Sequence, residues 1–114
     1  MAGPKIMVMY PRPTDVAVFE RAYMDEHMPM AREKITGFSR VVMTRVLGGP
    51  GGGAPFHLIV EIHFDSMDAL QRTLASPGMQ ETAAHAVSIS SGGAPVFMVT
   101  EEEDVDTQGM PYTG

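Results

Sequence analysis

The stretch Lys5-Ile6-Met7-Val8-Met9-Tyr10-Pro11-Arg12-Pro13, residues 5–13, carries the feature that decides the fold, a strand that ends abruptly before a helix. Its apolar part, residues 5–10, is short and bounded by prolines, which is typical of a buried central strand. The prolines end it because proline cannot extend a ladder of hydrogen bonds. Thr14 and Asp15 then offer N-cap chemistry and a negative charge, so we expect a helix to begin there.

The predicted first helix covers residues 15–27. At about 100° per residue, four of its side chains fall within an arc of roughly 80°, namely Val16, Phe19, Tyr23 and His27. Such an arc is the apolar stripe that a helix turns toward its sheet. A phenol and an imidazole are therefore expected to point into the fold, where buried polar groups need partners or a purpose.

Pro29 is predicted to stop this first helix. It cannot donate a hydrogen bond to the carbonyl of Asp25, and it biases Met28 away from helical geometry. A second short helical piece toward Lys34 is left open.

The rest of the chain predicts two strands, a second helical region and a last strand. A longer, partly exposed strand is expected over 38–47, followed by a glycine-rich loop over 48–55 and an alternating strand over 56–64. A helix should begin at Asp65, be interrupted by Ser76-Pro77-Gly78 and resume over 79–87. The last strand is expected over 95–100. Asp65 and Asp68 have the spacing of a capping box. In the strand over 56–64, His57 is expected to share one face with Ile59, Glu61 and His63.

This β-α-β-β-α-β order predicts an α+β, ferredoxin-like fold, with a four-stranded antiparallel sheet, two helices on one face, and the first and third strands at its centre. The first strand is apolar on both faces, and one helix layer covers only one of them. The other face would be a large exposed apolar patch. We therefore predict a homodimer with a two-fold interface; the alternative is a monomer whose tail folds back across the sheet.

Composition indicates one domain over residues 1–103 and an acidic, flexible tail over residues 104–114 of the 114-residue chain. Five of the 14 acidic residues lie between residues 101 and 106, which leaves nine acids against eight Lys and Arg elsewhere. No basic face suited to nucleic acid is evident. No run approaches the ~18 apolar residues of a membrane span, and no secretory signal is seen. Cysteine is absent, which excludes thiol nucleophiles and fits a cytoplasmic protein.

The segment Tyr23-x-x-Glu26-His27-x-Pro29 resembles the signature region of the EthD-like family, named for a gene of ethyl tert-butyl ether degradation. The stretch 8–13, the spacing of Phe19 to Tyr23, and Gly37-Phe38 resemble the same family, and the likeness covers roughly residues 4–100. It implies a dimeric α/β barrel of ferredoxin-like fold. Members resemble cofactor-free lactone isomerases and quinone-forming monooxygenases, and several are accessory proteins in the degradation of small organic compounds.

His27 is the foremost candidate for catalysis, because a histidine can accept and return a proton near neutrality. A helix C-terminus with Asp25 and Glu26 nearby favours the imidazolium and should oppose desolvation. The alternative is that His27 only caps carbonyls freed by Pro29. Tyr23 would supply a hydroxyl beside it, or would be a packed aromatic residue.

Three further residues are predicted to bind substrate: Tyr10, Phe19 and His57, the last of which could instead be a solvated strand end. Glu61 and His63 could reach one metal ion, but no third ligand is visible, so we predict no metal and no cofactor. His85 is expected to be a surface residue. Gly48–Gly53 lacks the Gly-Lys-Ser/Thr ending of a phosphate-binding loop.

Two functions follow. The first is a cofactor-independent isomerase or monooxygenase that acts on a small apolar or aromatic molecule and uses His27 to move a proton. The second is a non-catalytic accessory or small-ligand-binding dimer. A haem-binding protein is a more distant third, since dimeric barrels can hold haem through one histidine.

Overall fold

Four strands form one antiparallel sheet, namely β1 (Gly3–Pro11), β2 (Arg40–Arg45), β3 (Phe56–His63) and β4 (Val96–Glu102). Their spatial order is β2-β3-β1-β4, so β1 and β3 are central, as the sequence predicts. The structure is a computed structural model that describes residues 3–106 and 108. The predicted behaviour of the tail therefore lies mostly outside the described residues.

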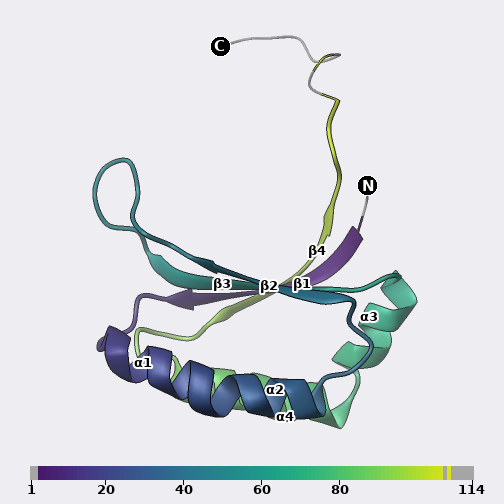
Figure 1. Cartoon of the computed structure of the whole chain (residues 1–114), viewed down its shortest axis with the longest axis horizontal. Coiled ribbons are helices and arrows are strands. Elements are labelled where there is room, and N and C mark those ends of the chain that lie inside the picture. Colours follow the sequence, from purple (N-terminus) through teal and green to yellow (C-terminus); the bar gives the residue numbers. More distant parts are fainter. Residues whose placement is uncertain (1–2, 107, 109–114) are drawn as a thin grey trace.

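All the helices lie on one face of this sheet (Figure 1). The first helical region consists of α1 (Val16–Ala22), the π-helical η1 (Tyr23–His27) and α2 (Met28–Lys34). The second consists of α3 (Met67–Leu74) and α4 (Pro77–Ile89). This arrangement is the predicted α+β, ferredoxin-like fold, with each of the two helical regions divided into shorter pieces.

The core lies between the sheet and these helices. The central strands place alternate residues in it, and the register pairs them across the strands: Ile6 with Ile62, Val8 with Val60 and Tyr10 with Leu58. The helices and the turn after them add further buried side chains, including Phe19, Tyr23, Ile35, Leu70, Met79 and Ala86. The other sheet face carries no helix among the described residues (Figure 1).

The prediction that Pro29 ends the first helix is wrong. A proline disrupts an α-helix because it lacks the N–H for the carbonyl four residues back and its ring clashes with that carbonyl. Here the chain widens into a π-turn first, and the Met28 N–H bonds to the carbonyl of Tyr23, five residues back. A new α-helix then begins with Pro29 in its first turn, where the missing N–H is tolerated.

Two helix starts are set by serines. Ser66 Oγ accepts a hydrogen bond from the Ala69 N–H at 3.1 Å, so the predicted capping box of Asp65 and Asp68 is wrong. Ser76 Oγ accepts from the Met79 N–H at 3.2 Å, and α4 begins at Pro77, two residues earlier than expected. A serine hydroxyl serves both starts because it can accept from the N–H three residues on.

The strand limits also differ from the prediction. β2 covers only Arg40–Arg45 of the expected 38–47, and β4 extends to Glu102, past the expected end at residue 100. β4 is longer because β1 begins at Gly3 and pairs with it, Gly3 opposite Glu102. No helix within the described part of the chain is long and apolar enough to cross a membrane.

Candidate functional site

A cavity of about 250 Å3 lies between the sheet and the helices. Its walls come from all four strands and from η1, α2 and α4. Most of its lining side chains are aliphatic or aromatic, and the polar exceptions are Tyr10, Tyr23, His27, Arg32 and Thr82. The Thr82 hydroxyl is already engaged, since it donates to the Gly78 carbonyl at 2.7 Å. The cavity is thus an apolar space with a few polar groups, the usual form of a small-molecule site.

Three rings form one polar edge of the cavity: Tyr10 of β1, and Tyr23 and His27 of η1. Their exposed fractions are 1%, 2% and 6%. The Tyr23 ring centroid lies 5.6 Å from that of Tyr10 and 5.1 Å from that of His27. The two residues of the predicted catalytic pair are thus in contact and both point inward, as the helical spacing predicts.

The polar atoms of these rings are incompletely bonded. Neither the Tyr10 nor the Tyr23 hydroxyl makes a hydrogen bond within residues 3–106 and 108, and His27 uses only Nδ1. Buried tyrosine hydroxyls usually have a partner. Two hydroxyls and one ring nitrogen are thus available, next to an apolar space, to a molecule that enters it.

Both phenols are neutral at physiological pH. Burial raises the pKa of Tyr10 far above its usual value, and the nearby Tyr23 adds to the effect. Burial raises the pKa of Tyr23 to about 12, while the charges of Arg45 and Glu20 act on it in opposite directions. Each hydroxyl can therefore donate as well as accept a hydrogen bond.

His27 is neutral as well, which corrects the expected imidazolium. Burial and, secondarily, the neighbouring His85 lower the pKa of His27 to about 4. The expected helix C-terminus is absent at this residue, because the chain continues into α2. Without the negative end of a helix dipole, desolvation of the charged ring dominates.

His85 contacts His27, although the sequence suggested a surface residue. The two Nδ1 atoms are 3.0 Å apart, and the ring planes lie within 10° of parallel. His85 Nε2 lies 3.6 Å from the carboxylate of Glu26. The pairing could have been suspected from helix periodicity, because His85 follows the buried Thr82 by three residues and so lies beside the inner face of α4.

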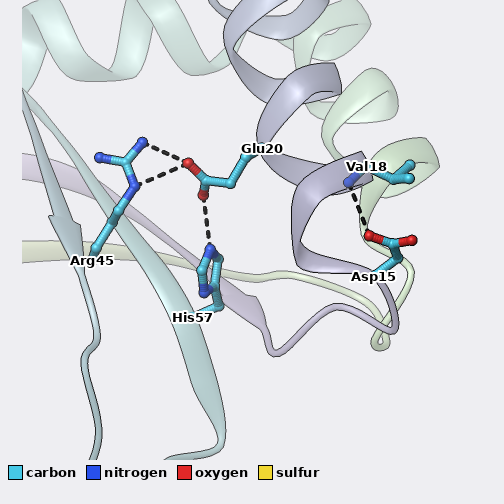
Figure 2. A network of polar contacts seen from close by, with 5 residues as sticks. All are labelled: Asp15, Val18, Glu20, Arg45 and His57. Carbon is cyan, nitrogen blue, oxygen red and sulfur yellow. Dashed lines mark hydrogen bonds and ion pairs between the residues drawn. The ribbon is translucent and has the colours of Figure 1, made fainter.

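A second polar cluster joins α1 to the sheet. Figure 2 shows the Glu20 carboxylate between Arg45 of β2 and His57 of β3. Arg45 donates to Glu20 Oε1 from Nε at 3.0 Å and from Nη2 at 2.7 Å, and His57 Nε2 lies 2.8 Å from Oε2. Burial opposes ionisation of Glu20, but the bonds from Arg45 and His57 outweigh it and lower the pKa of this carboxyl.

His57 lies on the helix side of the sheet, not on the face shared with Ile59, Glu61 and His63 as expected. The pairing of β1 and β3 shifts between Tyr10 and Pro11: Tyr10 lies opposite Leu58 and Pro11 opposite Phe56, so that no β1 residue lies opposite His57. This bulge breaks the two-residue alternation and turns the buried ring toward α1. The solvated strand end that the sequence left open is excluded.

Of the predicted substrate-binding residues, Tyr10 lines the cavity, whereas Phe19 and His57 do not. Phe19 packs edge-on against Tyr10, with centroids 5.1 Å apart, and against His57 at 5.7 Å. Phe19 thus packs against the polar edge of the cavity without lining it, and His57 packs against Phe19. Among the described residues, no three His, Cys, Asp or Glu side chains are grouped so as to hold a metal ion.

The fold and the cavity together define a class: an α+β, ferredoxin-like protein with a small-molecule-sized apolar space between its sheet and its helices. Within this class, the chain belongs to the EthD family, because the EthD domain model matches residues 11–89. The predicted family resemblance is confirmed.

Two relatives cover almost the whole chain. An uncharacterised 11.0 kDa protein from the thcB–thcC intergenic region of Rhodococcus erythropolis is 26% identical over 101 residues, which are 89% of this chain and 96% of that protein. The crystal structure of an ethyl tert-butyl ether d (EthD) family protein from Bacillus halodurans C-125 is similar with a TM-score of 0.80 and 28% identity, over 89% of this chain and 99% of that one.

More distant structures share the fold alone. SnoaB from Streptomyces nogalater, described as a cofactor-independent oxygenase, has a TM-score of 0.57 and 16% identity, over 96% of this chain and 98% of that one. Several others, at 10–15% identity, are described as dimeric ferredoxin-like proteins.

Proposed function

We propose that this protein converts a small apolar or aromatic molecule without a cofactor, as an isomerase or a monooxygenase, with His27 as the residue that moves a proton. The observation that carries the proposal is the set of three incompletely bonded polar groups, carried by the buried residues Tyr10, Tyr23 and His27, along one edge of an apolar cavity. Family membership and the fold shared with a cofactor-independent oxygenase are consistent with it.

The polar edge favours a neutral substrate that carries oxygen. All three groups are uncharged near pH 7, and Arg32, on an exposed part of α2, is the charged residue among the described cavity walls. A ring bearing a hydroxyl or a carbonyl would place its carbon skeleton against the apolar walls and its oxygen against the phenols. Burying a charge there without a partner would be costly.

The chemistry that suits these groups is proton transfer. In an isomerisation, the free ring nitrogen of His27 would take a proton from a carbon next to a carbonyl, a tyrosine hydroxyl would donate to the oxygen that becomes negative, and the proton would return to another carbon. In an oxidation, dioxygen would be the co-substrate, and the same deprotonation would make the ring more electron-rich.

The alternative is a protein that binds such a molecule and does not convert it. The lowered pKa of His27 favours this alternative, because a nitrogen that is hard to protonate is a weak base, yet its lone pair can still accept a hydrogen bond.

One comparison separates the two. Binding and turnover of lactones, quinols and phenols would be measured for the wild type, His27→Ala and Tyr23→Phe, with Met24→Ala as the control because Met24 is exposed on the same π-turn. Turnover that falls at least 100-fold in His27→Ala while binding persists would support catalysis, at the lower end of what a general base contributes. Binding by the wild type with no turnover would refute catalysis and leave the binding role.

We also propose that the protein is a homodimer. The helix-free face of the sheet presents a band of apolar side chains: Met7, Met9, Val42, Ile59, Val96 and Met98. Val96 and Met98 are 40% and 37% exposed. Structures of the same fold that are described as dimeric support a second copy as the cover for this band.

A further inference from the structure

The contact between His27 and His85 joins the cavity to the protein surface. His27 is 6% exposed and lines the cavity, whereas the His85 side chain is 21% exposed, and the Glu26 side chain beyond it is 64% exposed. The three groups thus form a short chain, from η1 to α4 and back to η1, that runs from the enclosed space to the solvent.

Only one proton can lie between the two Nδ1 atoms, which are 3.0 Å apart. One imidazole therefore donates and the other accepts, and the choice decides which nitrogen His27 offers to the cavity. If His27 donates from Nδ1, its Nε2 carries a lone pair and can act as a base. If it accepts, its Nε2 carries the hydrogen and cannot.

The position of Glu26 favours one of these two arrangements. Its carboxylate lies 3.6 Å from His85 Nε2, and a negative charge favours a hydrogen on the nitrogen that faces it. A neutral His85 with its hydrogen on Nε2 has a bare Nδ1, which must accept. His27 then donates from Nδ1, and its Nε2 is left unprotonated.

We propose that His85, with Glu26 behind it, is the positioning residue that holds His27 in the base-competent tautomer and receives the proton that His27 passes on. This inference rests on the proposed function for the transfer step, but the tautomer does not depend on any substrate. In that step, the substrate's proton binds His27 Nε2 while the proton on His27 Nδ1 moves to His85 Nδ1. The positive charge then lies on His85 beside Glu26, and the substrate keeps the electron pair as an enolate or phenolate.

Moving the charge outward solves a physical difficulty of the site. A protonated His27 is strongly disfavoured, since burial lowers the pKa of this ring to about 4. The groups that share the cavity lining with it are the neutral phenols of Tyr10 and Tyr23 and the cation of Arg32, and none of them supplies a negative charge. His85 is better placed for the charge, because it is more exposed and a carboxylate lies next to it.

Ring-nitrogen NMR of 15N-labelled protein tests the tautomer directly. In the wild type at pH 7 we expect His27 to carry its hydrogen on Nδ1 and to have a bare Nε2. His85→Asn should keep this form, because an amide oxygen can replace the accepting Nδ1. His85→Ala should lose it, and Val87→Ala, an exposed position on the same helix, is the matched control. A hydrogen on His27 Nε2 in the wild type, or an unchanged tautomer in His85→Ala, would overturn the assignment.

The transfer step has two readouts. On acidification of the wild type without ligand, we expect the His27 ring to stay neutral down to about pH 4, and a His27 ring that is protonated at about pH 6 would refute the relay. With a substrate in hand, His85→Asn should reduce kcat at least tenfold with KM nearly unchanged, because the tautomer is kept but the proton acceptor is lost. Wild-type kcat in His85→Asn would also refute the relay. If no compound is turned over, the proposed function fails, while the NMR result still decides the tautomer.

Discussion

The variant Tyr23→Phe should show whether the Tyr23 hydroxyl contributes to the stability of the fold or to ligand binding. The variant removes one oxygen from a residue that is 2% exposed and leaves its ring contacts with Tyr10, Phe19 and His27 in place. Because the hydroxyl has no hydrogen-bond partner in the described residues, its removal breaks no bond of the folded chain. A phenylalanine also avoids the cost of burying a polar group.

The expected magnitudes follow from the number of hydrogen bonds that the substitution removes. We expect the free energy of unfolding of Tyr23→Phe to equal that of the wild type or to rise by up to about 1 kcal/mol. A bound phenol or ketone should lose one hydrogen bond, worth about 0.5–1.5 kcal/mol, so its Kd should rise by roughly 2- to 13-fold. Tyr10→Phe should behave in the same way, since its hydroxyl is equally without a partner.

Urea unfolding and ligand titration are the two assays. Protein concentration must be held fixed, because a dimer that dissociates on unfolding makes the apparent stability concentration-dependent. His27→Ala is the contrast, since it removes the contact with His85 and should destabilise the fold. A loss of more than about 1 kcal/mol in Tyr23→Phe would mean that the hydroxyl supports the fold, and an unchanged Kd would mean that it does not contact the ligand.

Three further predictions concern the fold. Between pH 6.5 and about 4, the unfolded chain binds a proton at His27 but the folded chain does not, so the free energy of unfolding should fall by up to about 3 kcal/mol as the pH drops through that range. Urea unfolding at a series of pH values would measure this loss, which should be smaller in His27→Gln. Gly78→Ala should lower the free energy of unfolding by about 1–3 kcal/mol or more, because the added Cβ would lie 2.2 Å from the Lys34 carbonyl oxygen. Gly51→Ala is the control: a Cβ there meets open space, so thermal stability should change little. Met9→Glu should convert the proposed dimer to a monomer in analytical ultracentrifugation, because it buries a carboxylate in the apolar band, and an unchanged mass would contradict the sheet-to-sheet interface.

The fold was predictable because its signals are periodic and local. Residues 56–64 alternate, the first strand is a continuous apolar run, and prolines and glycines separate the segments. These patterns give the order of the elements, and that order places the first and third strands at the centre, where Ile6, Val8 and Tyr10 pair with Ile62, Val60 and Leu58. Alternation also gives the burial of the strands, because side chains of one parity enter the core.

The details of the site were less predictable because they depend on one-residue irregularities. The shift in pairing at Tyr10 and Pro11 turns His57 to the opposite side of the sheet, where it meets Glu20. Strict alternation gives no sign of such a shift, since the residues on each side of it keep the expected order. The partner of His27 was missed for a different reason: His85 lies 58 residues away, and only the packing of α4 on η1 brings the two rings together.

The π-turn accounts both for the wrong prediction that Pro29 ends the first helix and for the surroundings of His27. The sequence places Pro29 where an α-helix should end, and a helix that ended there would put His27 at its C-terminus, where the helix dipole favours a positive charge. Widening the turn instead lets α2 continue over the cavity, where Met28, Ala31 and Ile35 form part of its wall. The same change removes the helix dipole from His27, buries the ring and leaves His85 as its hydrogen-bond partner. π-Turns inside α-helices are frequent at functional sites, and here one irregular turn accompanies the cavity wall, the neutral imidazole and its contact with His85.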